Sequence, residues 1–226
     1  MKIIRVIDFE TTGLPPDASV CEAAFVDVNA SPTFLMGKWH HLVQPTTPMS
    51  LGARATHHIT DDEIAETGIT WKDACGFLAE ETPDIYAAHN ADFEKAFFNP
   101  EGSRWIDTWK VALRLWPESP SHSNQVLRYY LNLIVGSEAM PPHRALPDAW
   151  VTAHILIAAA QVTSLDGMLK WSDEPPYLTK LTFGKHRGQL FSAVPKDYLE
   201  WIIKQDMEPG VIAAARRELQ KESQNA

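Results

Sequence analysis

The chain has 226 residues, of which 45% are hydrophobic and 22% are charged, and its formal net charge is −9. This composition excludes a disordered or low-complexity protein, and no apolar run reaches the ~20 residues that a membrane span needs. The acidic balance argues against a broad polyanion-binding surface, although the excess of acid lies in residues 1–170 and residues 171–226 are neutral. Two cysteines are too few for a disulfide framework, so we expect a soluble, cytoplasmic protein with reduced thiols.

The N-terminal third of the chain predicts three strands and two helices. Residues 2–9, 19–28 and 34–45 alternate or run apolar in the manner of successive strands. Because their connections are short, we expect them to form a meander. One helix is predicted to begin at Thr60, with three acids in its first turn, and another at Thr70, with an acid three residues later.

Strands and helices alternate in the middle of the chain. The predicted elements are a strand at 84–90, a helix at 91–99, a strand at 104–107, helices capped by Thr108 and Ser123, and a long helix over roughly 146–163. Strands first and alternating elements later predict a mixed α/β sheet with helices on its faces.

A break in composition at residues 171–177 separates a small C-terminal segment. In this segment Gly184 and Gly188 bracket a basic tip, which predicts a hairpin, and two helices are predicted after it. We therefore divide the chain into a first domain over 1–168 and a small α+β module over 177–226.

Two acids, Asp8 and Glu10, end the first predicted strand. Residues two apart in a strand point to the same face, so these carboxylates aim together. Two carboxylates this close repel each other unless a cation lies between them. Taken alone, the pair fits solvated residues at a strand end equally well.

Three further residues turn this pair into a candidate metal site. Asp92 lies just past the strand at 84–90, where open α/β sheets bind their ligands. Asp148 lies in the first turn of the long helix, and His143 lies in the loop before it. Each has an ordinary explanation by itself, as a helix N-terminal acid or a surface histidine. Together they predict a site for two Mg²⁺ or Mn²⁺ ions with a histidine as proton acceptor.

The segments VIDFETTGL, AHNADF and HRALPD resemble the three motifs of the histidine-containing DEDD exonuclease superfamily (DEDDh), over about residues 1–165. This resemblance implies an RNase H-like fold with a mixed five-stranded sheet flanked by helices. It also implies two divalent cations and 3′→5′ hydrolysis of DNA, from single-stranded and duplex 3′ ends, that releases nucleoside 5′-monophosphates. By the same resemblance Asp8 bridges both metals and His143 is the general base, while the metal sites are completed by Glu10, Asp92 and Asp148.

The resemblance further implies contacts to the 3′-terminal nucleotides. The predicted contact residues are Thr11, Thr12, Gly13, Leu14, His57, Ile59, Asn90 and Phe93. For the hydrophobic ones among them, a place in the core is an equally good explanation.

The C-terminal segment LTFGKHRGQLFSAVPKDYLEWIIK resembles the small module of exodeoxyribonuclease X-like proteins. Its cations Lys180, Lys185 and Arg187 are predicted phosphate contacts, or else belong to a solvated turn. Tyr198, Trp201 and Ile202 share a helical face and are predicted to lie in the core of the module rather than to stack on bases.

Two residues near the predicted site need separate explanations. Pro147 stands just before Asp148, where a position inside a helix would cost about 3 kcal/mol, so we expect the long helix to start near 146–147. Asp107 is predicted to cap a helix or bind a backbone group rather than a metal ion.

Two other functions fit the same sequence. One is an exoribonuclease that trims RNA 3′ ends, because contacts to a 2′-hydroxyl group cannot be placed from sequence. The other is a non-catalytic subunit that binds nucleic acid or a polymerase. The oligomeric state is not predicted.

Overall fold

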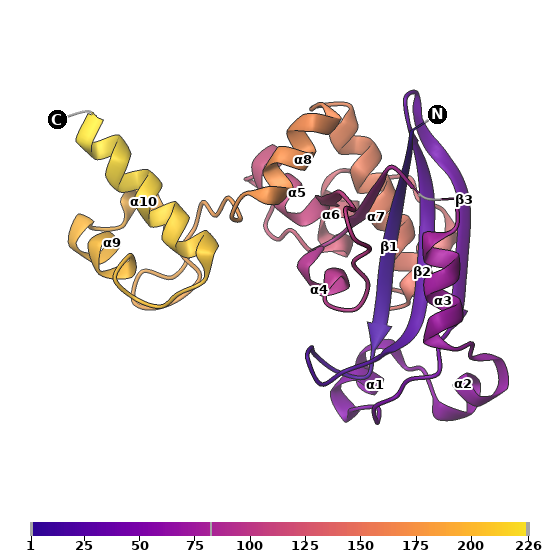
Figure 1. Ribbon diagram of the computed structural model, residues 1–226. Coiled ribbons are helices and arrows are strands. Elements are labelled where there is room, and N and C mark those ends of the chain that lie inside the picture. The colour runs from indigo at the N-terminus through magenta and orange to yellow at the C-terminus, as the bar shows by residue number, and fades with distance from the viewer. Residues whose placement is uncertain (1, 82, 225–226) are drawn as a thin grey trace.

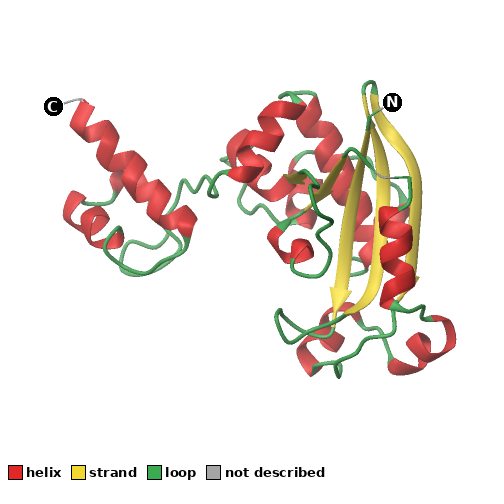
Figure 2. Ribbon diagram, in the orientation of Figure 1, coloured by secondary structure: helices red, strands yellow, loops and turns green. Residues whose placement is uncertain are grey.

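The computed structural model describes residues 2–81 and 83–224, and its centre is a five-stranded sheet with strand order β3-β2-β1-β4-β5 (Figures 1 and 2). The strands are β1 (Ile3–Thr11), β2 (Val20–Ala30), β3 (Thr33–Leu42), β4 (Ile85–Ala88) and β5 (Trp105–Asp107). β1, β2 and β3 form an antiparallel meander, and β4 and β5 extend the sheet in parallel with β1. The predicted meander and mixed sheet are confirmed.

Helices cover both faces of this sheet (Figure 1). They are α1 (Leu51–His57), α2 (Asp61–Thr67), α3 (Trp71–Ala79), α4 (Asp92–Lys95), α5 (Thr108–Leu115), α6 (Asn124–Tyr130), α7 (Ala145–Ala160), α8 (Leu165–Asp173), α9 (Lys196–Ile202) and α10 (Pro209–Gln224), with 3₁₀ turns at Ser137–Ala139 and Phe191–Ala193. The helices α1 and α8 were not predicted from the sequence. Since α8 packs on α5 and β5, the packing of the first domain continues beyond residue 168 to Asp173.

The alternation of β1 sends its side chains into two different cores. Ile4 and Val6 pack with α7 and α8, whereas Phe9 lies in the core that contains α3. Because side chains in a strand alternate, the face of Ile4 and Val6 continues to Asp8 and Glu10. Both acids therefore lie on the side of the sheet that α7 covers, which brings them toward the start of that helix.

Helix starts agree with prediction except at α5. The side chains of Thr60 and Thr70 cap α2 and α3 as predicted. The cap of α5 is Asp107, so the prediction for Asp107 is confirmed, whereas the predicted Thr108 cap is wrong. The Asp107 carboxylate accepts the N–H groups at the start of α5, which leaves Thr108 as the first helical residue. α7 begins at Ala145, two residues before Pro147, which still lies in the first turn, where a backbone N–H would have no partner.

The C-terminal segment has a hydrophobic core of its own, to which Leu181, Phe191, Leu199 and Ile202 belong. The predicted hairpin is present only as a short antiparallel pairing, with one bridge between Lys180 and Leu190 and backbone hydrogen bonds from Leu181 to Gln189 and from Phe191 to Thr179. A 3₁₀ turn follows directly at Phe191–Ala193 and turns the backbone out of the extended conformation that a second strand needs. The two predicted helices are present as α9 and α10.

No single helix in the described ranges is long and apolar enough to cross a membrane, and α7 and α8 meet that test only as a joined pair that bends by 116°. The cytoplasmic location stays a prediction.

Candidate active site

Three carboxylates meet where β1 passes the start of α7. Carboxylate oxygens of Asp8, Glu10 and Asp148 all lie within 4.8 Å of one another. β1 supplies the first two from one face, and α7, which packs on β1 and β2, supplies the third from its first turn. Residues about 140 positions apart in the chain are therefore joined only by the packing of α7 on the sheet.

This cluster holds more negative charge than its surroundings neutralise. Burial, and then repulsion by Asp148 and Glu10, raises the pKa of Asp8 well above its usual range. Burial and then repulsion by Asp148 raises the pKa of Glu10 to about 8. Burial also raises the pKa of Asp148, although hydrogen bonds from His143 and Gln125 oppose this shift. Carboxylates that are held together in this way favour a bound cation.

The loop before α7 places His143 next to Asp148. The backbone N–H of His143 donates to Oδ2 of Asp148 at 2.9 Å, and the side chain of His143 is exposed. The backbone of His143 is left-handed, with φ of 59°, a conformation in which histidine is enriched. The predicted loop position of His143 is confirmed.

Glu22 on β2 is a residue of this site that sequence analysis missed. Its side chain is 4% exposed and accepts two hydrogen bonds from the Arg144 guanidinium, at 2.7 and 2.9 Å. It also accepts the N–H of Ala145 at 2.9 Å. Glu22 lies opposite Glu10 in the β1–β2 ladder. Its hydrogen bonds to Arg144 and Ala145 therefore attach the loop that carries His143 to the sheet. The signal in the sequence was an acid in an otherwise apolar strand.

Asp92 does not join the carboxylate cluster. Its side chain is 64% exposed and pairs with Nζ of Lys95 at 3.3 Å and with Nζ of Lys110 at 3.5 Å. Partial burial raises the pKa of Asp92, but Lys110 and Lys95 outweigh that effect and lower it. The predicted metal ligand is thus already paired with two lysines, Lys95 on α4 and Lys110 on α5.

Glu94 is the acid of α4 that faces the cluster instead. It is 4% exposed, and its Oε2 is buried without a hydrogen-bond partner among the residues that the structure describes. Burial, and then repulsion by Asp107 and Glu10, raises the pKa of Glu94 well above its usual range. Glu94 also contributes to the raised pKa of Asp8. A buried, unpartnered carboxylate beside other acids is costly unless a cation binds it.

Helical periodicity explains why Glu94 rather than Asp92 points inward. Two residues apart in a helix lie on nearly opposite sides, whereas residues three or four apart share a face. Ala91, Glu94 and Phe98 follow that spacing and are all buried. This pattern in ADFEKAFF was the signal that could have identified Glu94 from sequence.

The eight predicted substrate-contact residues fall into two groups, four that are at least partly exposed to solvent and four that are buried. Leu14 is 79% exposed, Asn90 is exposed, and Gly13 and Phe93 are partly buried. These four residues stay candidates for substrate contact.

The other four predicted contacts are buried and bind other parts of the protein. Thr11 donates to the carbonyl of Gly13 at 2.6 Å. The hydroxyl of Thr12 lies 2.7 Å from that of Thr47, which anchors the loop after β1. His57 accepts the N–H of Ile59 at 3.0 Å through Nδ1, and burial lowers its pKa. Ile59 lies in a small core with Cys21 and Ile64.

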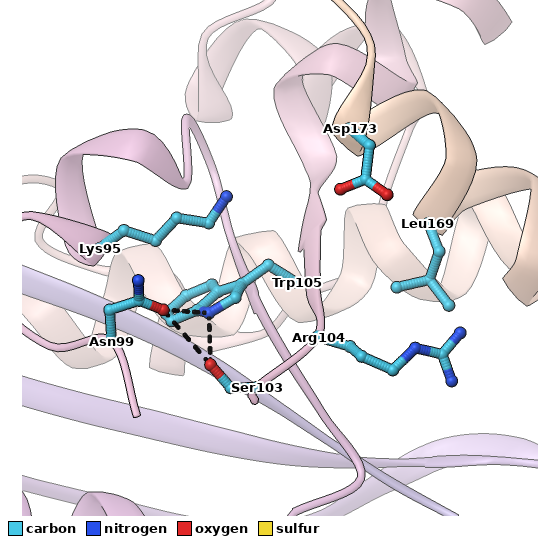
Figure 3. A pocket seen from close by; sticks show the side chains of 7 residues that line it. All are labelled: Lys95, Asn99, Ser103, Arg104, Trp105, Leu169 and Asp173. Carbon is cyan, nitrogen blue, oxygen red and sulfur yellow. Dashed lines mark hydrogen bonds between the residues drawn. The ribbon is translucent and has the colours of Figure 1, made fainter. Parts of the chain in front are cut away.

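A cavity of about 420 Å³ lies among α4, β5 and α8 (Figure 3). Within it the indole N–H of Trp105 donates to Oγ of Ser103 at 2.9 Å and to Oδ1 of Asn99 at 3.1 Å. The carboxylate cluster does not line this cavity.

The three predicted phosphate contacts, Lys180, Lys185 and Arg187, are exposed on the C-terminal module.

Comparison with known proteins finds similar exonucleases and DNA polymerases. The chain is 34% identical over 209 residues to Exodeoxyribonuclease 10 of Escherichia coli strain K12, which covers 88% of this chain and 90% of that protein. It is 27% identical over 181 residues to the PolC-type DNA polymerase III of Thermotoga maritima, covering 74% of this chain and 12% of that protein.

Solved structures give the same result. The fold matches Exonuclease X in complex with 5′ overhanging duplex DNA, with a TM-score of 0.65 and 33% identity over 75% of this chain and 99% of that chain. E. coli Exonuclease I in complex with a dA16 oligonucleotide matches in fold, with a TM-score of 0.59 at 17% identity over 76% of this chain and 43% of that chain. The RNase T exonuclease family model matches residues 6–156, and the chain belongs to this exonuclease family.

Proposed function

We propose that this exonuclease is a metal-dependent 3′→5′ exodeoxyribonuclease that releases nucleoside 5′-monophosphates. The observation that carries the proposal is the meeting of Asp8, Glu10 and Asp148 on the face of the sheet that α7 covers. The similarity to Exodeoxyribonuclease 10 and to Exonuclease X with its duplex DNA supports DNA as the substrate.

The donor atoms fit two hard divalent cations. Carboxylate oxygens are the ligands that Mg²⁺ and Mn²⁺ prefer. We assign the metal sites to Asp8, Glu10 and Asp148 of the cluster and to Glu94, whose buried Oε2 has no other partner in the described chain. When bound, the ions stabilise the charge that develops on the attacking and leaving oxygens of the phosphodiester. This assignment replaces Asp92 with Glu94.

His143 acts as the general base in this proposal. It removes a proton from the attacking water, a task that suits an exposed histidine next to the acids. The hydrogen bond from its backbone to Asp148 and the Glu22–Arg144 ion pair hold its loop against the sheet. The ring is therefore carried on a fixed backbone while its side chain stays accessible to substrate.

Digestion of end-labelled oligonucleotides tests the function. Single-stranded, duplex and overhang DNA are compared with matched RNA, with Mg²⁺, with Mn²⁺ and with chelator. With a 5′ label, 3′→5′ removal gives a ladder that shortens progressively, and a 3′ label is released as mononucleotide at the first step. Release of a 5′-labelled mononucleotide at the start, or equal rates in chelator, would overturn the proposal. Faster digestion of RNA would identify an exoribonuclease instead.

The His143→Asn variant is expected to lose turnover by about 10²- to 10⁴-fold, the usual contribution of general base catalysis. Asparagine tolerates the left-handed backbone and retains the N–H that Asp148 accepts. The matched control is His58→Asn, because His58 is also exposed and has φ of 59°. Calorimetric titration with Mn²⁺ should give unchanged affinity for His143→Asn; a parallel loss of Mn²⁺ affinity would show a structural role.

Metal-free protein is expected to lose stability as pH rises from about 5 to about 8. A carboxyl group whose pKa is higher in the folded state stabilises the fold below its ordinary pKa, and this contribution is lost as pH rises through the folded-state value. For Glu10 that window extends from 4.5 to about 8. Thermal unfolding in chelator and in Mg²⁺ measures the effect. We expect Mg²⁺ to raise Tm strongly at pH 8 and weakly at pH 5, and an equal rise at both would contradict the assignment.

A further inference from the structure

The C-terminal module carries a surface that combines aromatic rings with unpaired cations. The ring of Tyr198 lies 4.7 Å from that of His186 and 5.1 Å from that of Trp201, measured between centroids. Nζ of Lys185 lies 5.2 Å above the Tyr198 ring. Lys185 and Arg187 are exposed and form no ion pair within the described chain. We call these five residues the aromatic-basic surface.

Trp201 lies outside the buried core of the module. That core is built from Leu181, Phe191, Leu199 and Ile202, all of them buried, whereas Trp201 is 43% exposed. The predicted core position of Ile202 is therefore confirmed, and that of Trp201 is wrong. An indole ring that is open to solvent next to exposed cations has the composition of a single-strand binding platform, on which bases stack and phosphates pair.

The basic tip is held in a defined position against α9. Gly184 has φ of 65°, and a Cβ atom there would lie 2.5 Å from the Tyr198 hydroxyl oxygen, so the turn packs directly on that ring. Nδ1 of His186 lies 3.1 Å from Oε1 of Gln189, which orients the imidazole. Lys185 and Arg187 are thus carried on a turn that is fixed next to the rings.

The module is also joined to the exonuclease domain in a defined way. The Tyr177 ring lies between the guanidinium of Arg114 on α5, 5.3 Å from its centroid, and that of Arg217 on α10, at 4.0 Å. Next to this joint a cleft of about 590 Å³ is lined by Asn90 and Asp92 on one side and by residues of the module on the other. The module stands beside α5 and α8, on a short linker after α8 (Figure 1).

We propose that the aromatic-basic surface binds the single-stranded DNA that extends upstream from the 3′ end in the active site. The bases stack on Trp201, and Lys185 and Arg187 pair with phosphates. Charge complementarity selects this occupant, since the tip is cationic while α9 carries charges of both signs, with Lys196 beside Asp197 and Glu200. The inference rests on the proposed function and adds a second contact that only long strands reach.

Binding is measured by fluorescence anisotropy of a labelled single-stranded oligonucleotide of about twenty nucleotides, with full-length protein in chelator so that nothing is cleaved. Trp201→Ala is expected to weaken binding about tenfold, as for loss of one stacked base, and Trp201→Phe to restore most of it. In the Lys185→Gln/Arg187→Gln double variant, the plot of log binding constant against log salt concentration should become less steep. The magnitude of its negative slope should fall by about 1.4, which is about 0.7 for each lost phosphate contact. Lys221→Gln on α10, which removes one charge far from the tip in sequence, is the control and should leave the slope unchanged.

Hydrolysis in Mg²⁺ separates this inference from the proposed function. We expect Trp201→Ala to raise KM for the long strand about tenfold and to leave turnover of a trinucleotide unchanged, because in this inference Trp201 contacts only nucleotides upstream of those in the active site. Unchanged binding of the long strand, or equal losses on both lengths, would overturn the inference. If the unmodified protein cleaves neither substrate, the proposed function fails, while the anisotropy measurements still decide whether the surface binds single strands.

Discussion

Asp8→Asn is expected to lower nuclease turnover by at least ~10³-fold and, at the same time, to stabilise the metal-free protein at neutral pH. The first effect follows because a two-metal site supplies several kcal/mol of transition-state stabilisation, and each 1.36 kcal/mol is tenfold in rate. The second follows because burial, and then repulsion by Asp148 and Glu10, raises the pKa of Asp8 well above its usual range. Ionised Asp8 therefore destabilises the fold when no cation is bound.

Initial rates in Mg²⁺ and thermal unfolding in chelator at pH 8 measure the two effects on the same preparation. Asp62→Asn is the matched control, since Asp62 is an exposed acid in the first turn of α2. It should leave the rate unchanged. If Asp8→Asn lost activity together with stability, the carboxylate would be a structural group of the fold, and its assignment as a metal ligand would be wrong.

Glu94→Gln is expected to lower turnover by about 10²-fold or more, whereas Asp92→Asn should change it by less than about threefold. Both changes remove one negative charge from α4 and keep the side-chain shape, so the pair isolates the position of the charge. Glu94 is buried with an unpartnered oxygen and adjoins the acids, whereas Asp92 is 64% exposed and pairs with Lys95 and Lys110. Ion pairs at an exposed carboxylate contribute only about 0–1 kcal/mol.

Titration with Mn²⁺ gives this comparison a readout other than activity. Glu94→Gln should weaken Mn²⁺ binding, and Asp92→Asn should leave it as in the unmodified protein. The opposite ranking, with Asp92→Asn the more damaged, would restore Asp92 as the ligand and give Glu94 a structural role. Because Glu94→Gln removes a buried charge, its metal-free Tm should not fall, so misfolding would not explain lost activity.

The acidic side chains of the site repel one another in the folded protein. Burial and mutual repulsion raise the pKa of Asp8, Glu10, Asp148 and Glu94. Acids whose pKa values are shifted this far are typical of functional sites. Their repulsion lowers the stability of the metal-free fold, and the same arrangement allows them to bind cations. The Arg144–Glu22 pair is the compensating contact, since Arg144 also lowers the pKa of Glu10.

Local patterns determined most of what sequence analysis predicted correctly. Period-two alternation identified β1 to β3 and placed Asp8 and Glu10 on one face, because that periodicity is a property of the strand itself. Capping chemistry located the starts of α2 and α3 at Thr60 and Thr70, because those hydrogen bonds span three residues. Motif resemblance supplied the exonuclease family and its fold.

Only the tertiary structure decided which acids meet. Asp92 and Glu94 are both acids and lie two residues apart, and the burial of Ala91 and Phe98, on either side of α4, turns Glu94 inward. Glu22 gained its role because the β1–β2 register and the start of α7 bring it to Arg144, 122 residues away. Such contacts depend on how elements pack across the sheet, and no periodicity within one segment specifies them. The sequence by itself thus determined which carboxylates were available, and the packing of α4 and α7 on β1 decided which of them form the site.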